Sequence, residues 1–508
     1  MSTSAMPHLR HHCLVPQRSG WPDLGDRRPV VPAATVVAHL LAAAERAAAG
    51  ARAVGVRHLL TDPWIDAVPQ SRVTVVAAPE GRDRMGVAFG PFARASVELA
   101  GQYPPPPDPW DVPAQRPEYV LPAAAELYAG RWLTQGPAYA GVTALLGGGP
   151  RHLAAAVTVP WAPGGLLGAV SQLIGCLLLT AGSGRTVSVP VRVRGIRMFG
   201  PPPCAGTVAE CRITVVTLTA TSVVADAHLL VNGAVWAQVT GWQERRLAVP
   251  DTRLGGGYPE RSALSRPQPG GWVLIRDAWP DPASRDLIVR TQLGGAEREE
   301  YARRSPHGRR QWLLGRIAAK DAVRHWLWAR GAGPVYPAEI RVRQDADGRP
   351  RAVGLHGREL PALHLALAHR ADAAVALVRA QGPGPETWQR PGIGVEEISE
   401  RADRFRGAWE PGERELLSDG RAPEGLPVRA ARFRAARQAV AAAEGTRLRE
   451  VAVTATDGDH AAVTSGARTR DVLCAEVTSR TPGAPGRRYS VAWTPSPAED
   501  GHARPSGP

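Results

Sequence analysis

The segment from Gly164 to Gly182, GGLLGAVSQLIGCLLLTAG, constrains the fold more than any other part of this 508-residue chain. It is an apolar run that approaches membrane-spanning length, but Ser171, Gln172 and several glycines interrupt it. These residues predict a helix buried in a protein core rather than a membrane span. A helix that is apolar on most sides must be enclosed by other elements, and alternating strand-like runs flank this one.

The first 248 residues combine such a helix with several strands twice. An alanine- and leucine-rich helix is expected after the Pro-Val-Val-Pro sequence at 29–32, with strands such as SRVTVVAAP following it. The helix at 164–182 is followed by the strand-like runs VSVPVRVRGI, ECRITVVTLTATSVVADAHLLV and AVWAQVTGW. A proline run, 103–110, separates the two parts as a linker. The pattern predicts a double hot-dog, in which a sheet wraps one central helix in each half.

Several short motifs resemble polyketide-synthase dehydratase domains. His12, on an expected short strand, followed by Pro-Val-Val-Pro, resembles their histidine and Pro-Val-Leu-Pro pattern. Residues 134–139, TQGPAY, are similar to a Phe-His-Gly-Pro-x-Phe segment, and 166–172 to a Leu-Leu-Asp-x-x-x-Gln segment that ends at Gln172. The ending GWQERR, 241–246, is also similar.

The resemblance implies a particular acid–base chemistry. A histidine removes the α-proton of a 3-hydroxyacyl thioester, and an aspartic acid from the other half protonates the leaving hydroxyl. His12 matches the histidine, whereas the aspartate falls on Gly168. Asp23 and Asp26 follow His12 without a spacing that places them across the tunnel. His12 is therefore either catalytic or a retained structural residue. Gln172 is the second catalytic candidate of this half and is expected to pack or bind near the thioester. We expect this half to bind acyl chains without efficient dehydration.

The rest of the chain predicts a second, α+β domain. A linker rich in Gly, Pro and Arg is expected at 249–271, the domain at 272–494 and a disordered tail at 495–508. Residues 311–331 have apolar side chains at helical spacing, which predicts a helix that buries one face against a sheet. A strand, turn and strand at 338–350, a buried strand from Leu363, a further helix ending near Thr446 and final strands complete the pattern.

Two motifs in this domain resemble the 4'-phosphopantetheinyl transferases of the long, pseudo-dimeric type. GIGVE, 392–396, is similar to their Gly-x-Asp-x-Glu segment, and 434–442 lies where their helix reads Trp-x-x-Lys-Glu-Ala-x-x-Lys. The resemblance implies two similar halves, at 272–361 and 362–493. It also implies transfer of the phosphopantetheine arm of coenzyme A to a carrier-protein serine, with Mg²⁺ on the phosphates.

The positions of the expected carboxylates and lysines are altered. Glu396 keeps one carboxylate and is the expected metal ligand, while the Asp falls on Gly394 and the helix Glu on Gln438. Arg437 replaces the first lysine as a catalytic candidate, and Ala442 replaces the second. Glu397 or Asp403 are alternative ligands, although neither has the matching spacing. The motif is therefore expected to be degraded.

Three further residues are candidates for coenzyme A contacts. Arg349, in Gly-Arg-Pro, matches the Gly-Lys-Pro turn of the transferases, and His369 matches their Ser-x-Ser-His histidine. Lys320, the only lysine of the chain, lies in GRIAAKDAVR. Lys320 either contacts a coenzyme A phosphate or is a charge on a helix surface. His369 has the alternative of being a hydrogen-bonded core histidine.

The formal charge is +14, and nearly all of the basic residues are scattered arginines. The sequence contains no dense run of basic residues that would indicate a nucleic-acid site. The net charge alone leaves nucleic-acid binding as a third alternative. A basic surface suits acidic carrier proteins. Five cysteines without metal-ligand spacing and an N-terminus without an apolar signal core predict a cytoplasmic protein.

These observations lead to one hypothesis and one main alternative. The hypothesis is an accessory protein of a polyketide synthase that binds acyl carrier proteins and acyl thioesters through degraded dehydratase-like and transferase-like domains, as a pseudoenzyme or scaffold. The alternative is an active holo-acyl-carrier-protein synthase that uses coenzyme A and Mg²⁺. Neither requires a membrane or nucleic acid, and hot-dog domains often form homodimers.

Overall fold

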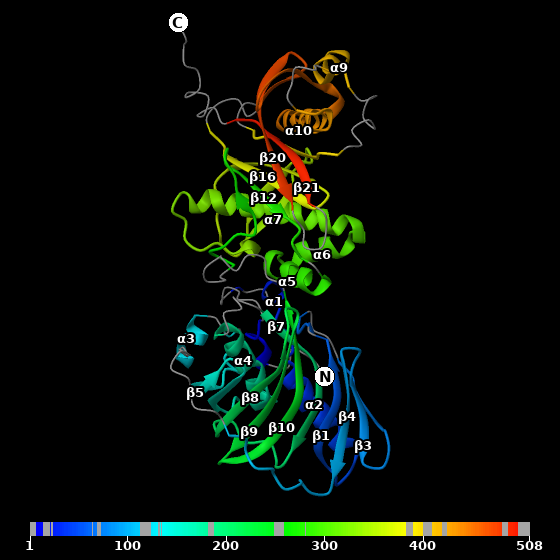
Figure 1. Cartoon of the computed structure of the whole chain (residues 1–508), viewed down its shortest axis with the longest axis vertical. Helices are drawn as coiled ribbons and strands as arrows, with labels where there is room; N and C mark the ends of the chain where they lie inside the picture. Colours follow the sequence, from blue (N-terminus) through cyan, green and yellow to red (C-terminus); the bar gives the residue numbers. More distant parts are fainter. Residues whose placement is uncertain are drawn as a thin grey trace. The chain divides into compact units, whose positions relative to one another are not determined.

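The structure is a computed structural model, and the chain divides into two compact units, Met1–Thr252 and Arg253–Pro508 (Figure 1). Each unit is described by itself. The residues that the structure describes are 7–13, 21, 24–62, 64–68, 73–111, 123–130, 133, 135–180, 187–247, 259–279, 281–382, 390–399, 409–418, 424–479 and 486–495.

The first unit is built on one antiparallel sheet of ten strands, in the order β2-β3-β4-β1-β7-β10-β9-β8-β6-β5. Strands β1 and β7 pair with each other and so join the two halves of the sheet. The strands are β1 (Arg52–Thr61), β2 (Val75–Pro79), β3 (Arg84–Phe89), β4 (Ala93–Ala100), β5 (Val142–Gly149), β6 (His152–Thr158), β7 (Val187–Met198), β8 (Val208–Leu218), β9 (Ser222–Val231) and β10 (Ala234–Leu247).

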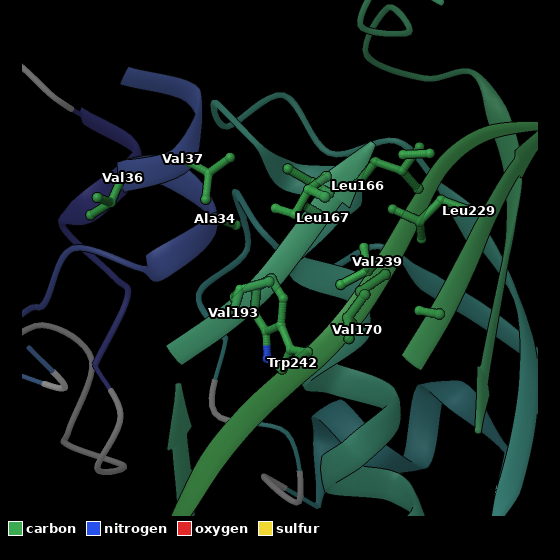
Figure 2. Close-up of a cluster of buried hydrophobic side chains, with 14 of the residues drawn as sticks. Ala34, Val36, Val37, Leu166, Leu167, Val170, Val193, Leu229, Val239 and Trp242 are labelled. Carbon is green, nitrogen blue, oxygen red and sulfur yellow. The ribbon is translucent and has the colours of Figure 1, made fainter. Parts of the chain in front are cut away.

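Each half of this sheet encloses one helix. Helix α2 (Ala33–Ala47) packs on β1 to β4, and α4 (Gly165–Thr180) packs on β6 to β9, as side chains from both helices and several strands meet in one core (Figure 2). The short segments η2 (Pro7–Leu9), α1 (Leu24–Arg27) and α3 (Ala124–Ala129) complete the unit. The predicted double hot-dog and the buried helix at 164–182 are confirmed.

Two details of the first unit differ from the sequence predictions. His12 does not lie on a strand, because it follows a turn and its carbonyl accepts a hydrogen bond from the Val30 amide at 3.0 Å. The proline run, 103–110, has no regular secondary structure, but it also packs against the sheet in addition to linking the halves. Its last residue, Trp110, stacks on His228 with ring centroids 3.7 Å apart.

The second unit contains two helix-covered antiparallel sheets and one separate hairpin. The elements of the first part are β11 (Arg266–Pro267), β12 (Trp272–Arg276), α5 (Pro282–Gln292), α6 (Gly295–Arg303), α7 (Pro306–Trp328), η3 (Pro337–Glu339), β13 (Ile340–Gln344), β14 (Pro350–Gly354), β15 (Leu363–Arg370) and β16 (Ala373–Ala380). Those of the second are β17 (Ile393–Glu397), α9 (Pro411–Ser418), α10 (Leu426–Glu444), η5 (Leu448–Glu450), β18 (Val451–Asp457), β19 (His460–Ser465), β20 (Arg468–Ser479) and β21 (Arg487–Trp493).

The two sheets of this unit pack on each other, and α7 and α10 cover their outer faces. The sheets run β11-β12-β16-β15 and β17-β21-β20-β19-β18. The side chains of β12 explain why this sheet is covered on both faces. Val273 and Ile275 face α7, while Trp272 and Leu274 face the core between the sheets. Because strand side chains alternate, both faces of β12 are apolar, as expected for a strand buried on two sides.

Two predicted boundaries in this unit are wrong. Strands β15 and β16, expected in the second half, pair with each other and β16 pairs with β12, so the first half extends to Ala380. The segment 259–271, expected as linker, is packed: the Leu264 and Ser265 amides donate to Asp321 at 3.0 and 2.8 Å. The earlier residues of the expected linker, 249–258, lie outside the described residues, as do 496–508 of the expected tail.

The remaining strand and helix predictions for this unit are confirmed. The helix at 311–331 is the larger part of α7, the strand–turn–strand at 338–350 is β13 and the start of β14, and the helix ending near Thr446 is α10. Within the described residues, no helix is long and apolar enough to cross a membrane.

Candidate functional site

The first unit contains a cavity of about 120 Å³ beside helix α4. Apolar side chains and a smaller set of polar ones line it together. The lining residues are His12, Val30, Val31, Pro32, Ala33, Ala34, Asp62, Leu133, Gln135, Tyr139, Gly168, Ser171, Gln172, Gly175, Leu179, Val187, Ser188, Pro190, Trp242 and Glu244. This mixture of an apolar wall and a few convergent polar groups is typical of small-molecule sites.

One face of α4 forms a wall of the cavity. Gly168, Ser171, Gln172 and Gly175 all line it, and their spacing of three and four residues places them on one side of the helix. The sequence predicts the buried helix, and the structure shows that these small and polar residues, together with Leu179, face the cavity.

Gln172 lines the cavity but is held on both ends of its amide. Its Nε2 donates to the Tyr139 carbonyl at 2.9 Å, and its Oε1 accepts from the Tyr128 hydroxyl at 2.5 Å. The Tyr139 hydroxyl is in turn hydrogen-bonded to Thr35 Oγ1 at 2.8 Å. Gln172 therefore fixes the segment around Tyr139 against α4, and the structure assigns it a positioning role rather than the catalytic one expected.

His12 lies in the same cavity, where it is 4% exposed. Gly136 makes this possible, because a Cβ there would lie 2.4 Å from the His11 carbonyl oxygen. The Gly136 amide donates to His12 Nδ1 at 3.4 Å, and the ring lies 4.7 Å from that of Tyr139. Thus Gly136 and Tyr139 from the predicted 134–139 motif contact His12, and Gln135 lines the same cavity. Thr134 lies outside the described residues.

Burial lowers the pKa of His12 to about 4, with a smaller contribution from nearby His8. The ring is therefore neutral at pH 7. Because Nδ1 accepts the Gly136 hydrogen bond, the neutral ring carries its proton on Nε2. This arrangement suits hydrogen bonding to a bound oxygen better than proton abstraction.

His12 should make the first unit sensitive to acid. Its pKa is lower in the folded than in the unfolded chain, so the unfolded state binds the extra proton and stability falls as the pH drops from 6.5 towards 4. Between pH 7 and pH 4.5 the loss is about 2 kcal/mol. Hydrogen exchange of peptides from α2 and α4 at the two pH values measures it. In His12→Gln the pH dependence should shrink by that amount, and an unchanged dependence would contradict the assignment.

The position that the dehydratase resemblance gives to the acid carries no carboxyl group. Gly168 faces the cavity, and a Cβ added there would meet only the Ala34 Cβ at 3.8 Å, which is an ordinary contact. Asp26 does not line the cavity, and Asp23 lies outside the described residues. Position 168 therefore has room for a side chain, but the residue there is glycine.

The structure adds to the cavity the carboxyl group of Glu244, which belongs to the GWQERR ending but has no role assigned to it by the sequence motifs. Glu244 is 1% exposed and binds Ser171 Oγ through Oε1 and Ser188 Oγ through Oε2, both at 2.5 Å. Trp242 Nε1 donates to Oε1 at 3.0 Å. Burial raises the pKa of Glu244, which favours the protonated acid. A signal exists in the sequence, since Glu244 occupies an inward position of the alternating strand β10, two residues after buried Trp242.

In the second unit, Glu396 is surrounded by cationic and amide groups. Arg370 lies 3.1 Å from its Oε1, and Arg434 lies 3.4 Å from its Oε2. Gln438 donates to Oε2 at 3.2 Å and accepts from the Val395 amide at 3.1 Å. The carboxylate is 3% exposed and already neutralised by two guanidinium groups.

These surroundings do not fit Mg²⁺. The ion prefers several oxygen ligands, and no group of three His, Cys, Asp or Glu side chains that could hold a metal occurs among the described residues. A Cβ on Gly394 would lie 2.1 Å from the Ala435 carbonyl oxygen, so a carboxylate has no space there. Glu397 is paired with Arg487 at 3.4 Å, and Asp403 lies outside the described residues.

Arg437 does not point to a reaction centre. Its guanidinium binds Glu413 at 3.2 Å and the Leu448 carbonyl at 2.8 Å, and the side chain is buried. Glu413 also accepts from the Val453 amide at 2.9 Å. Arg437 thus ties α10 to α9 and β18, which is a structural role in place of the catalytic one expected.

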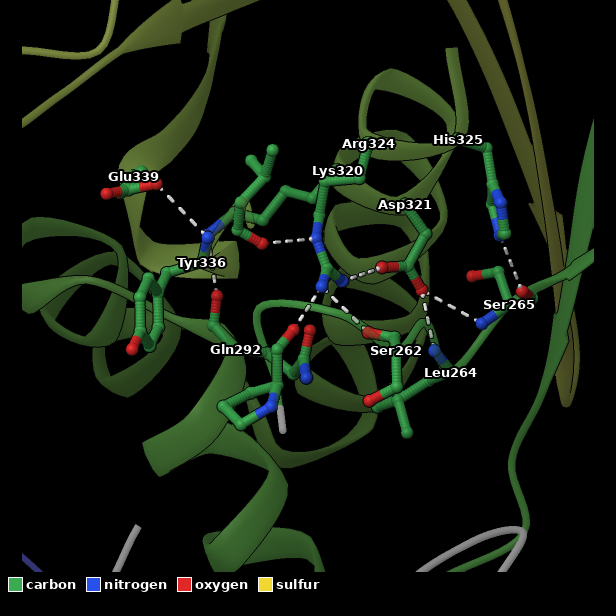
Figure 3. A network of polar contacts seen from close by, with 12 residues as sticks. Ser262, Leu264, Ser265, Gln292, Lys320, Asp321, Arg324, His325, Tyr336 and Glu339 are labelled. Carbon is green, nitrogen blue, oxygen red and sulfur yellow. Dashed lines mark hydrogen bonds and ion pairs between the residues drawn. The ribbon is translucent and has the colours of Figure 1, made fainter. Parts of the chain in front are cut away.

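Lys320 is also an internal residue, and neither expected role fits it. It is fully buried and its ammonium binds Glu297 of α6 and the Gln292 carbonyl at the end of α5. The next turn of α7 holds a second buried pair, Asp321 with Arg324 at 2.8 Å, which binds the segment 259–265 (Figure 3). These pairs stabilise the first half of the unit rather than contact a ligand.

Arg349 lies where it could contact an anion. It lines a cavity of about 220 Å³ together with Arg351, Arg390 and His364, and Asp345 is the acidic residue of the lining. Its guanidinium also lies over Gly445, at the carbonyl end of α10. Ala442, the expected second lysine position, lines the same cavity, but Glu396 does not. His369 is exposed at the end of β15 and does not line this cavity either.

Comparisons with known proteins are limited. No protein-family model and no curated protein matches the chain. Among solved structures, it is similar to the dehydratase domain of a mycocerosic acid synthase-like polyketide synthase, with 21% identity over 49% of this chain and 89% of that one, and a TM-score of 0.35.

Two further solved structures are similar in the same way. The dehydratase domain of PpsC from Mycobacterium tuberculosis, in complex with C12:1-CoA, shares 19% identity over 44% of this chain and 86% of its own, with a TM-score of 0.35. The dehydratase domain from the CurJ module of curacin polyketide synthase shares 18% identity over 48% and 90%, also with a TM-score of 0.35. All three similarities cover about half of the chain.

Proposed function

We propose that the protein binds acyl thioesters carried by acyl carrier proteins, as an accessory protein of polyketide or related lipid biosynthesis, and that the acyl chain occupies the cavity of the first unit. The cavity beside α4 carries this proposal. Its volume of about 120 Å³ approaches that of engineered apolar cavities, about 150 Å³, which bind benzene. The enclosed wall is apolar, while His12 and Glu244 supply hydrogen-bonding groups. A reducing cytoplasm suits the five cysteines, all of which are free.

We infer that the second unit contributes an anion-binding surface. Three arginines, Arg349, Arg351 and Arg390, line its cavity, and guanidinium groups bind phosphate oxygens well. The ligands proposed for this surface are the phosphates of coenzyme A or of the phosphopantetheine arm. This binding would occur without a transfer reaction.

The acyl proposal is tested by filling the cavity. Gly168→Leu projects a side chain into it, whereas Gly168→Ala adds only a methyl group that has room. Isothermal titration calorimetry with octanoyl-pantetheine should show binding to the wild-type protein and to Gly168→Ala, and at least tenfold weaker binding to Gly168→Leu. Gly168→Ala should also stabilise α4 by about 1 kcal/mol. Absence of binding to the wild-type protein, or equal binding to all three, would contradict the proposal.

The alternative function is an active 4'-phosphopantetheinyl transferase. Intact-mass spectrometry of an apo carrier protein, incubated with this protein, coenzyme A and Mg²⁺, distinguishes the two. The binding proposal predicts no mass gain, because the Glu396 carboxylate is paired with Arg370 and Arg434. A gain of one phosphopantetheine arm that disappears in Glu396→Ala would establish the transferase instead.

A further inference from the structure

The polar cluster Ser171–Glu244–Ser188 is not needed to bind an apolar chain. Its three side chains come from α4, β10 and β7, and all of them line the acyl cavity. A carboxyl group in a buried, mostly apolar wall is unfavourable unless its oxygens are hydrogen-bonded. Here both oxygens are bound, by two serine hydroxyls at 2.5 Å and one indole N–H at 3.0 Å.

The protons of this cluster determine what it offers to the cavity. The Trp242 N–H and the Ser171 O–H both donate to Oε1. If Glu244 is protonated on Oε2, its own O–H makes the bond to Ser188, and the Ser188 hydroxyl keeps its proton. That hydroxyl can then donate into the cavity. If Glu244 is ionised, both serine protons are used on the carboxylate and the cluster offers only an acceptor.

Burial favours the first of these two states, in which Glu244 is protonated. Glu244 is 1% exposed, and burial raises its pKa. Among the described residues that line the cavity there is no arginine or lysine, so no cation in this lining favours the ionised form. The lining also contains Asp62 and His12, and burial keeps the His12 ring neutral by lowering its pKa. Burial and the absence of a cation in this lining both favour the protonated state, which leaves the Ser188 proton available as a donor.

We propose that Ser171, Ser188 and Glu244 form a recognition site for an oxygen substituent of the bound chain, so that the cavity selects oxygenated acyl groups over unsubstituted ones. The Ser188 hydroxyl donates to the substituent, and Glu244 with Ser171 holds that hydroxyl in place. This inference rests on the proposed acyl-binding function and adds the chemical class of the chain. An unsubstituted chain would leave the donor unpaired in a buried wall, which disfavours it.

The test compares three probes by calorimetry on the full chain: octanoyl-pantetheine and its 3-hydroxy and 5-oxo derivatives. For the wild-type protein, at least one of the two oxygenated probes should bind about five to ten times more tightly than octanoyl-pantetheine. This ratio corresponds to the free energy of one hydrogen bond. Ser188→Ala should remove this preference, so that the oxygenated probes and octanoyl-pantetheine bind with similar affinity. Ser96→Ala, a buried serine of β4 outside the cavity, is the matched control and should leave the preference unchanged.

Substitutions of Glu244 separate recognition from folding. Glu244→Gln resembles the protonated acid, since its amide N–H can donate to Ser188, and it should keep the preference. Glu244→Ala should lose it. If the wild-type protein binds none of the probes, the proposed function fails. If it binds all three equally, or if Ser188→Ala keeps the preference, acyl binding stands and the recognition site is refuted.

Discussion

Replacing Lys320 with methionine is expected to lower the free energy of unfolding of the second unit by about 3–5 kcal/mol. The ammonium is fully buried and binds both the Glu297 carboxylate and the Gln292 carbonyl. Its removal leaves Glu297, which is 1% exposed, as an uncompensated buried charge. Glu297 also accepts from the Val342 amide, so the loss should loosen α5, α6 and β13 around α7.

Hydrogen exchange of peptides from α7 measures this effect. The double variant Lys320→Met with Glu297→Gln should recover most of the lost stability, because it removes both charges and keeps an acceptor for Val342. Arg303→Met, an exposed cation on α6, should change stability by less than about 0.5 kcal/mol. A Lys320→Met protein of normal stability that binds coenzyme A more weakly would instead support the phosphate contact expected from the sequence.

Introducing a side chain at Gly394 is expected to destabilise the second unit by about 3 kcal/mol or more. A Cβ there would lie 2.1 Å from the Ala435 carbonyl oxygen and 2.8 Å from the Gln438 Cβ, so α10 would have to move away from β17. Gly394→Asp, which restores the transferase motif, should therefore unfold this region and gain no activity. Thermal unfolding and intact-mass assays of Gly394→Ala and Gly394→Asp measure both effects.

Gly168→Ala in the first unit is the matched control for this prediction. Both glycines stand where the family resemblances imply an aspartate, but only Gly168 has room for a Cβ, with its nearest neighbour 3.8 Å away. Alanine should be tolerated at Gly168 and not at Gly394. A Gly394→Asp protein that folds normally and modifies a carrier protein would show that β17 and α10 can separate to form an active site.

The sequence predicts the elements whose signal is local. The apolar run of α4, the helical spacing of α7 and the alternating strands after Thr446 correspond to elements of the structure. The division of the second unit could not be predicted in this way, because β16 pairs with β12, which lies about a hundred residues earlier in the chain. Such long-range pairing leaves no trace in local periodicity.

The candidate residues show the same limit. Motif resemblance groups His12 with the segment 134–139, and the structure brings His12 and Gly136 into contact. The role of Lys320 could not be predicted because its partner, Glu297, belongs to another helix, and a sequence does not show which charges meet in a core. Glu244 could have been found, since an acid at an inward strand position requires buried partners.

The most direct test of the account is to locate the bound acyl chain. A pantetheine thioester whose acyl chain carries a photoreactive diazirine is irradiated with the protein, and the labelled peptides are identified by mass spectrometry. The account predicts labels on α4 and on the cavity-lining ends of β7 and β10, with a large loss of labelling in Gly168→Leu. Labels outside the first unit, or labels unchanged by Gly168→Leu, would contradict acyl binding in this cavity.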